Sequence, residues 1–372
     1  MYVKSLELKN YRNYESLNLE FREGTNILYG DNAQGKTNAL ESIYMSFTSK
    51  SHRGSKDKEI IKLGEKEAHI KVIIIKNEVP YRIDMHLRAN KNKGVAINGV
   101  PIRKVTELFG IGNVVFFSPE DLSIIKNGPS ERRKFIDTEL CQSDKIYAYN
   151  LSSYVKVLNQ KNKLLKDVGI SKNKELEDTL DIWDERLAMF GSEIIVRRKK
   201  FIADMGDIIS EIHSMITDSK EHIKIVYEPS FNGNNLYDEF KKNRKKDIYY
   251  KSTSIGPHRD DISFFINGMD VRKYGSQGQQ RTVALSLKLS EIEFVKKQVG
   301  DVPVLLLDDV LSELDSNRQK QLLNSIKGIQ TIITCTGLDE FIENRFNIDN
   351  IYRISKGNVI ENDMKGMVKS YE

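Results

Sequence analysis

The chain has 372 residues, 39% hydrophobic and 30% charged, which is enough to bury a sizeable core without disulfide or metal staples. Its formal net charge of +5, from 58 basic and 53 acidic residues, is mild, so any nucleic-acid affinity requires a local basic face. The sequence lacks an apolar run of about 18 residues and an apolar leader, which argues against a membrane partner. Two distant cysteines, Cys141 and Cys335, favour a reduced, cytoplasmic location.

The N-terminal third is predicted to be rich in strands. Turn signals separate short apolar or alternating segments, and Asn98-Gly99 is typical of a type I′ hairpin. The predicted strands cover residues 3–9, 18–21, 27–29, 70–75, 81–87 and 95–102. A further buried strand ends at Phe117, before Pro119 forces the chain out of regular structure.

A glycine-rich loop separates the strand at 25–29 from a helical segment at 38–43. Its sequence is Gly30-Asp31-Asn32-Ala33-Gln34-Gly35-Lys36-Thr37, the GxxxxGKT pattern. Glycines let backbone N–H groups turn around a phosphate, and the helix presents its positive end to it. Lys36 would reach the β- and γ-phosphates, and Thr37 would offer its hydroxyl to Mg²⁺. The loop therefore predicts a nucleoside triphosphate site, the alternative being a chance glycine-rich turn.

From about residue 130 to 217 the apolar period becomes helical. Two long antiparallel helices are predicted, with residues 169–173 as the turn between them. Their apolar stripes are interpreted as packing, without chemistry. Near residue 252 strands return, and predicted helices at 279–297 and 317–325 alternate with strands at 302–307 and 331–335. The order is α/β, so the helical middle is interpreted as an insertion between two halves of one nucleotide-binding domain.

Two adjacent acids, Asp308 and Asp309, end the apolar run at 304–307. Ionised carboxylates at the end of a buried strand are costly unless they serve a cation. Asp308 is predicted to support a Mg²⁺ ion with Thr37, and Asp309 to polarise the attacking water. Either acid alone could instead cap a helix.

Two further segments resemble motifs of the ABC-type ATPases. Residues 274–281 open a helix with Ser276, Gly278 and Gln279, and residues 311–315 follow the two acids and end at Asp315. In that family these places hold the signature motif and the D-loop. By this resemblance Ser276, Gly278 and Gln279 act in trans on the triphosphate of a second subunit, and Asp315 belongs to the nucleotide site.

Motifs over nearly the whole chain narrow the resemblance to the RecF family of bacterial DNA replication and repair ATPases, which are related to the heads of SMC proteins. They lie at residues 9–14, 117–122, 128–133, 256–261, 275–281 and 306–315. The resemblance implies an ABC-type P-loop ATPase core with a mixed sheet, and an inserted, mainly helical second lobe. We place the core at 1–122 and 252–372 and the lobe at 123–251.

The same resemblance implies a function. It predicts an ATP-switched protein of recombinational repair and replication-fork maintenance that forms a homodimer on duplex, gapped or junction DNA. It also implies partnership with RecO and RecR in loading the recombinase, and slow, DNA-stimulated ATP hydrolysis. Asp309 stands where transporters carry Glu, and Thr334-Cys335-Thr336 stands where an H-loop histidine is expected, which leaves Thr334 or Thr336 as substitutes. Both departures favour a slow switch.

Lysine and arginine runs are the candidates for sequence-independent phosphate contact. Charge runs also occur as ordinary solvated helix faces, and that alternative stays open here. The candidates are Arg197, Arg198, Lys199, Lys200, Lys242, Lys245 and Lys246. No histidine, cysteine or acid cluster has zinc spacing, and His258 is as compatible with a structural turn as with a site.

Two other functions fit the sequence less well. A transporter ATPase subunit would show a much shorter spacing than the 236 residues between Thr37 and Tyr274 (274 − 37 − 1). A small-molecule kinase or GTPase would not need the Ser276 motif, and the Asn-Lys-x-Asp guanine motif is absent from the sequence. Both alternatives are weaker than an ATP-switched DNA-binding protein.

Overall fold

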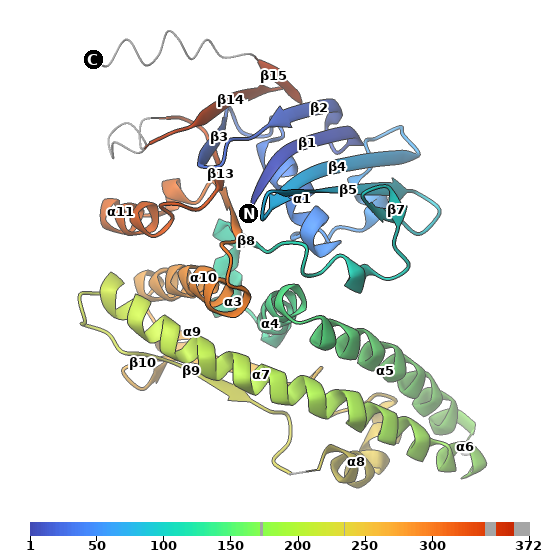
Figure 1. The fold of residues 1–372 in the computed structure, drawn as a ribbon. Helices are drawn as coiled ribbons and strands as arrows, with labels where there is room; N and C mark the ends of the chain where they lie inside the picture. Colours follow the sequence, from blue (N-terminus) through green and yellow to red (C-terminus); the bar gives the residue numbers. More distant parts are fainter. Residues whose placement is uncertain (172–173, 234, 339–346, 361–372) are drawn as a thin grey trace. The chain divides into compact units, whose positions relative to one another are not determined.

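The computed structural model describes residues 1–171, 174–233, 235–338 and 347–360. The chain divides into two compact units, residues 1–121 with 291–372 and residues 122–290 (Figure 1). The predicted lobe at 123–251 differs from the second unit at its far boundary, because β10 (Asp261–Ile266) pairs with β9 (Ile223–Glu228) and holds the segment after 252 in that unit. The assignment of domains stays a prediction.

The first unit contains an antiparallel sheet of six strands in the order β2-β1-β4-β5-β6-β7. Alternation along β4 buries Ile70, Val72 and Ile74 on one face. The hairpin at Asn98-Gly99 is confirmed, since both residues have the positive φ angles, 52° and 81°, that a type I′ turn needs. The strands are β1 (Tyr2–Tyr11), β2 (Tyr14–Glu20), β4 (Glu67–Lys76), β5 (Val79–Arg88), β6 (Gly94–Ile97) and β7 (Val100–Pro101).

A second sheet in the same unit has the order β15-β14-β3-β13-β12-β8. Strands β14, β3, β13, β12 and β8 run parallel to one another, whereas β15 is antiparallel to β14. The central strands are buried along their length, which explains their continuous apolar sequence. The strands are β3 (Thr25–Tyr29), β8 (Val114–Phe117), β12 (Val304–Asp308), β13 (Thr331–Cys335), β14 (Asn350–Ser355) and β15 (Asn358–Ile360).

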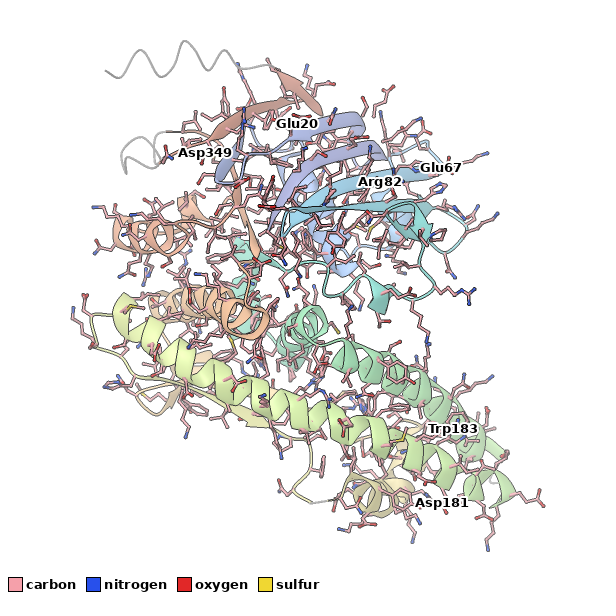
Figure 2. The ribbon with its side chains drawn as sticks, viewed as in Figure 1. Glu20, Glu67, Arg82, Asp181, Trp183 and Asp349 are labelled. Atoms are coloured by element: carbon pink, nitrogen blue, oxygen red, sulfur yellow. The ribbon has the colours of Figure 1, made fainter. Side chains whose placement is uncertain are left out.

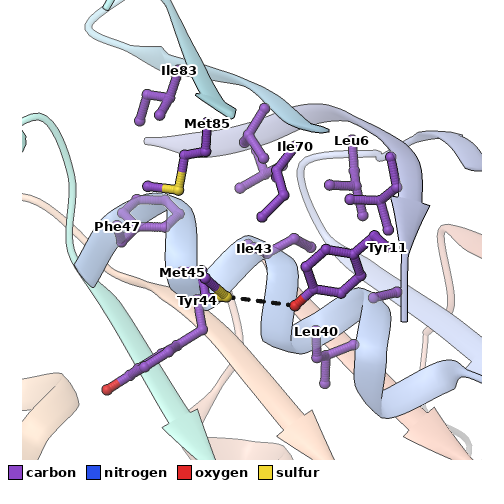
Figure 3. Packing of buried hydrophobic residues seen from close by; sticks show 14 of the residues in the cluster. Leu6, Tyr11, Leu40, Ile43, Tyr44, Met45, Phe47, Ile70, Ile83 and Met85 are labelled. Carbon is purple, nitrogen blue, oxygen red and sulfur yellow. Dashed lines mark hydrogen bonds between the residues drawn. The ribbon is translucent and has the colours of Figure 1, made fainter. Parts of the chain in front are cut away.

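Helix α1 joins the two sheets into one core. Figure 3 shows its apolar side chains against strands of the first sheet, where the Tyr11 hydroxyl lies 3.5 Å from the Met45 sulfur. Removing such buried side chains typically costs about 2–5 kcal/mol. The unit's helices and 3₁₀ turns are α1 (Lys36–Thr48), α2 (Asp57–Ile60), α11 (Ser316–Ser325), η1 (Val105–Glu107), η2 (Pro119–Asp121) and η3 (Leu311–Glu313).

The second unit is mainly helical and is built around α5 (Lys145–Ser171) and α7 (Leu180–Ile216). The two predicted long helices are therefore confirmed. The predicted turn at 169–173 lies partly inside α5, and residues 172 and 173 lie outside the described residues. The remaining elements are α3 (Leu122–Lys126), α4 (Pro129–Ser143), α6 (Lys174–Asp178), α8 (Leu236–Tyr250), β11 (Met269–Asp270), α9 (Val271–Tyr274) and the start of α10 (Gln277–Val299).

Ion pairs run through the interior of this helical unit. Lys161 Nζ lies 2.7 Å from Asp184 Oδ1 and 3.4 Å from Asp247 Oδ2, with all three side chains at most 2% exposed. Arg244 joins the same group through Asp184 at 2.6 Å and through Asp181 at 2.5 Å. Figure 2 labels Asp181 on α7. The pairs connect α5, α7 and α8, so their loss would leave buried charges uncompensated.

The described helices include no apolar span of the length and hydropathy that a membrane crossing needs.

Candidate nucleotide site

The glycine-rich loop follows β3 and leads into α1, as predicted. Gly30 and Gly35 have φ angles of 146° and 113°, which other residues rarely adopt. A Cβ at Gly30 would lie 2.3 Å from the Ile354 carbonyl oxygen, and one at Gly35 would lie 2.6 Å from the Asn13 side chain. Close neighbours as well as torsion angles therefore require glycine at both places. The 13-residue helix beginning at Lys36 directs its free N–H groups toward the loop.

The Lys36 ammonium lies inside the loop it belongs to. Its Nζ donates to the carbonyl oxygens of Gly30 at 2.6 Å and Asp31 at 2.8 Å. Burial lowers the pKa of Lys36, against the attraction of Asp309 and Asp308. The Lys36 ammonium is thus held at the glycine-rich loop by two carbonyl groups.

Asp308 is the meeting point of two hydroxyl groups. Thr37 Oγ1 and Thr334 Oγ1 each donate to Asp308 Oδ1 at 2.7 Å. Asp308 pairs with Thr334 in the parallel register of β12 and β13, so the carboxyl end of the sheet brings these groups together. The Thr334 hydroxyl, proposed as a substitute for the missing histidine, is already used in holding Asp308.

Asp309 has a left-handed backbone, with φ at 53°. Its N–H donates to Thr334 Oγ1 at 3.1 Å, so the turn after β12 is fixed by the neighbouring strand. Such a conformation costs about 1–3 kcal/mol and is found where the surroundings enforce it, often at functional sites. The hydrogen bond to Thr334 on the neighbouring strand therefore fixes the backbone direction at Asp309. Its role with water stays a prediction.

Hydrogen bonds from residues of the β1–β2 turn hold the backbone of the glycine-rich loop in place. Asn13 Nδ2 donates to the Gln34 carbonyl at 2.9 Å, and Tyr14 Oη donates to the Gly35 carbonyl at 2.9 Å. Asn38 donates to Asn13 Oδ1 at 2.8 Å. Sequence patterns assigned no role to Asn13 and Tyr14 beyond the family resemblance. The polar and aromatic residues between the first two predicted strands, which include Asn13 and Tyr14, were a signal for this contact that was missed.

Glu41 on α1 anchors this turn from inside the protein. It is fully buried and accepts two hydrogen bonds from the Arg12 guanidinium, both at 2.8 Å, and one from Ser51 Oγ at 2.5 Å. Burial raises the pKa of Glu41, but these hydrogen bonds outweigh it, and the net pKa lies below the usual value. A bidentate pair of this kind fixes orientation as well as charge.

The predicted signature residues belong to the second unit and form a helix cap there. Ser276 N donates to Gln279 Oε1 at 3.0 Å, and Gln279 N donates to Ser276 Oγ at 3.2 Å. This reciprocal pair caps the first turn of α10. Gln279 Nε2 also donates to Glu221 Oε1 at 2.9 Å. Gly278 lies between them, and a Cβ there would come no nearer than 3.8 Å to Ser276 Oγ.

Asp315 caps α11 in the first unit. Its Oδ1 accepts from Arg318 N at 3.0 Å, and its Oδ2 pairs with Arg318 Nη1 at 2.5 Å. The backbone hydrogen bond from Arg318 lowers the pKa of Asp315. These contacts give Asp315 a capping role, and its part in a nucleotide site stays a prediction.

The basic candidates differ in their surroundings. Arg198 is 1% exposed and donates to Tyr147 Oη at 2.9 Å, to the Pro257 carbonyl at 2.6 Å and to Asp137 Oδ1 at 2.7 Å. Burial and these three hydrogen bonds disfavour its predicted role as a phosphate contact. Arg197 pairs with Asp144 at 2.9 Å.

The lysine candidates lie at the surface of the second unit. Lys199 and Lys200 are exposed on α7, and Lys245 and Lys246 are exposed on α8. Lys242, also exposed, pairs with Glu239 at 2.6 Å. These side chains can meet solvent-borne phosphate, which Arg198 cannot.

One histidine group was missed because its members come from two strands. Glu67 and His69 are two residues apart on β4, and His69 stands opposite His86 on β5. Glu67 Oε2 lies 2.7 Å from His86 Nε2, and the two imidazole rings stack at 4.1 Å. Arg88 Nη2 lies 3.2 Å from His86 Nδ1. Because arginine only donates, this contact leaves the His86 proton on Nε2, directed at Glu67. Figure 2 labels Glu67.

Two motifs of the second unit, residues 128–133 and 256–261, meet in the fold. Arg132 forms a bidentate pair with Asp261, at 2.7 and 2.9 Å, and Arg133 donates to the Asp260 carbonyl at 2.8 Å. His258 Nδ1 lies 2.7 Å from Tyr154 Oη, and His258 Nε2 lies 3.1 Å from the Thr253 carbonyl. Burial lowers the pKa of His258 to about 4. The structural interpretation of His258 is therefore favoured.

The chain matches one family model and many curated proteins. The model, described as the RecF/RecN/SMC N terminal domain, matches residues 2–360. A relative from Lachnospira eligens is 63% identical over 360 residues, covering 97% of this chain and 99% of the relative. A relative from Clostridium tetani is 48% identical over 371 residues, covering 97% and 100%. Both carry the name DNA replication and repair protein RecF.

Solved structures agree with these relatives. One, described as the recombination mediator protein RecF-ATP in the RecFOR pathway, is 38% identical with a TM-score of 0.90, covering 97% of each chain. An Smc head domain from Pyrococcus furiosus is 18% identical with a TM-score of 0.58, covering 99% of this chain and 98% of the other, which shows the fold alone. The predicted fold class, an ABC-type ATPase core with a helical insertion, is confirmed.

Proposed function

Since the chain belongs to the RecF family of DNA replication and repair proteins, we propose that it is an ATP-switched DNA-binding protein whose two copies join on DNA when ATP is bound. Its role lies in DNA replication and repair, and the alternative of a transporter ATPase subunit is not favoured. The family relatives in the RecFOR pathway support RecO and RecR as partners of this chain.

One observation carries the proposal, the 2.7 Å contact between Thr37 Oγ1 and Asp308 Oδ1. Two adjacent ligands of an octahedral Mg²⁺ at 2.0–2.1 Å are about 2.9 Å apart, so these oxygens already have nearly the separation that the ion requires. Hydroxyl and carboxylate oxygens are also the donors that Mg²⁺ prefers. Thr37 and Asp308 would hold Mg²⁺, which would neutralise charge on the phosphates.

Lys36 supplies the other half of the site. Its ammonium is held by the Gly30 and Asp31 carbonyls and would exchange these for the β- and γ-phosphate oxygens of ATP. Asn32, Ala33, Gln34 and Gly35 complete the loop, whose N–H groups would surround the phosphates. Asp309 would polarise the attacking water, and its shorter side chain is consistent with slow hydrolysis.

The helix opened by Ser276 would act on the ATP of the second copy. Ser276, Gly278 and Gln279 lie at the N-terminus of the 23-residue α10, where the positive end of the helix dipole favours an anion. Two copies related by a two-fold axis would exchange this contact reciprocally. ATP then stabilises the dimer by mass action, and hydrolysis releases it.

Binding of duplex DNA with and without a non-hydrolysable ATP analogue tests this function. The analogue is expected to raise the DNA affinity of the wild-type chain and to leave Lys36→Ala unaffected, because that variant lacks the phosphate cation. Lys58→Ala, which removes an exposed lysine on α2, serves as the matched control and should respond like the wild type. Equal responses from the wild type and a folded Lys36→Ala would refute the proposal.

A further inference from the structure

The C-terminal part of α8, from Lys242 to Tyr250, carries an outward face of lysines and tyrosines, which we call the α8 face. Residues three and four apart share one side of a helix, and this spacing places the members together. Tyr249 is 78% exposed and Tyr250 is 64% exposed. The α8 face consists of Lys242, Lys245, Lys246, Tyr249 and Tyr250.

The opposite side of α8 is anchored in the second unit. Leu236 and Phe240 are buried at 3% and 0% exposure. Asp247, also buried, accepts from Ser254 N at 3.0 Å and lies 3.4 Å from Lys161 Nζ. The helix is thus fixed by its inner side, so the two tyrosines are held outward by the fold.

The two rings form a perpendicular pair in solvent. Their centroids are 5.0 Å apart and their planes make an angle of 89°. Burying a tyrosine ring is favourable, so two adjacent rings at this exposure offer a surface that a partner can cover. Because the planes are perpendicular, a flat ligand can stack on one ring while its edge meets the other.

The charge on this face is unbalanced. Among the described residues, Lys245 and Lys246 have no carboxylate within ion-pair distance, whereas Arg244 on the inner side pairs with Asp181 and Asp184. Asp247, the acid nearest to them on α8, is buried away from the face. The rings therefore lie beside two lysines that no described carboxylate neutralises.

We propose that the α8 face binds single-stranded nucleic acid, with an unpaired base stacked on Tyr249 or Tyr250 and with Lys245 and Lys246 on the adjoining phosphates. Exposed aromatic rings beside cations are the combination that takes unpaired strands, because every base offers a flat face for stacking. A duplex hides those faces between its base pairs. Protein interfaces are depleted in lysine, which makes a nucleic acid the better match for this surface. The inference rests on the proposed DNA-binding function. It adds that the α8 face binds the single-stranded part of the DNA.

The test compares single-stranded and duplex DNA on the full chain by fluorescence anisotropy. In a variant carrying Tyr249→Ala and Tyr250→Ala, affinity for an oligo-dT strand is expected to fall about 5- to 150-fold, the range that one stacked base supplies. Affinity for blunt duplex should change less than about twofold. The slope of affinity against salt should stay the same, because no charged group is removed.

Two further variants separate stacking from other effects. Tyr249→Phe with Tyr250→Phe keeps both rings and should bind the single strand like the wild type. Tyr149→Ala removes a 51% exposed ring on α5 and should also bind the single strand like the wild type. Three outcomes would overturn the inference: equal losses of single-strand affinity in the phenylalanine and alanine variants, equal losses of affinity for both DNA forms, or no loss of affinity. In each case, duplex binding by the wild type would still support the proposed function. A wild-type chain that binds neither DNA form would overturn both.

Discussion

Thr37 and Asp308 are 271 residues apart in the sequence, yet the Thr37 hydroxyl donates to Asp308 Oδ1 at 2.7 Å. The contact joins the first turn of α1 to the end of β12, where we propose that the cation of the nucleotide site binds. Because Thr334 donates to the same oxygen at 2.7 Å, the carboxylate is fixed before any ligand arrives.

The two acids after β12 are expected to differ in their effects. Asp308→Asn removes a charge from the proposed Mg²⁺ site, so the concentration of Mg²⁺ needed for half-maximal ATP binding should rise. Asp309→Asn should keep ATP binding and slow hydrolysis at least tenfold, because it removes the group that would polarise water. Equilibrium ATP binding across a Mg²⁺ titration measures the first effect, and single-turnover hydrolysis measures the second. Unchanged turnover in both variants would exclude the assignment.

The buried cation Lys161 should be important for the stability of the helical unit. Lys161→Met leaves Asp184 and Asp247 facing each other with less compensation, so the free energy of unfolding should fall by about 3–5 kcal/mol. Lys163→Met, which removes an exposed lysine from the same helix, should change it by less than about 0.5 kcal/mol. Urea unfolding of both variants provides the comparison, and a similar small loss in each would show that the buried pairs are not stabilising.

Acid should destabilise the second unit through His258. Burial lowers the pKa of His258 to about 4 from its ordinary value of 6.5. Between these values the unfolded chain binds a proton that the folded chain rejects, so stability is greatest above pH 6.5 and falls as the pH drops toward 4. The loss has a ceiling of about 3 kcal/mol. His258→Gln should flatten this part of the pH profile, whereas exposed His222→Gln should keep it. A wild-type slope in the His258 variant would contradict the assignment.

The lysines of α8 should contribute to the salt dependence of duplex binding. Neutralising Lys242, Lys245 and Lys246 to Gln should reduce the slope of log affinity against log salt by about 0.9 for each DNA phosphate that these lysines neutralise in the wild type. Sequence preference should not change, because phosphates carry no base identity. Neutralising the exposed Lys56, Lys58 and Lys66 is the matched control. If the α8 variant keeps the wild-type slope, these lysines are a solvated face.

Local patterns were enough to predict which segments form the proposed nucleotide site. Two patterns have a direct physical interpretation. Lys36 and Thr37 follow two glycines at the spacing of a phosphate-binding loop, and an apolar run before Asp308 predicts a carboxylate at the end of a buried strand. That the two segments meet follows from the parallel order of β3, β13 and β12, for which the alternation of strands and helices was evidence. The long helices α5 and α7 were predicted from apolar periodicity alone.

Contacts between distant side chains could not be predicted in the same way. Arg198 belongs to a charge run in the sequence, which shows its neighbours along the helix but not the Asp137 and Tyr147 side chains that enclose it. Asn13 reaches the glycine-rich loop only because the β1–β2 turn lies behind it. Residues 252–290 were predicted to belong to the core because strands return near residue 252. Local sequence does not reveal the pairing of β10 with β9, which places β10 in the second unit.

The central claim is that ATP joins two copies of the chain through the helix opened by Ser276. Ser276→Arg places a long side chain where the partner's triphosphate would lie and should leave ATP binding by the monomer nearly intact. Gln298→Arg adds the same charge at an exposed position near the other end of α10 and is the matched control. Melting of the ATP-free variants shows whether loss of the Ser276 cap, worth about 1 kcal/mol, disturbs the fold.

Sedimentation of the three proteins with a non-hydrolysable ATP analogue and Mg²⁺ is the most direct measurement. The wild type and Gln298→Arg are expected to form dimers whose fraction rises with analogue and protein concentration, whereas Ser276→Arg should remain monomeric. Equal dimer fractions in all three folded proteins would contradict the account.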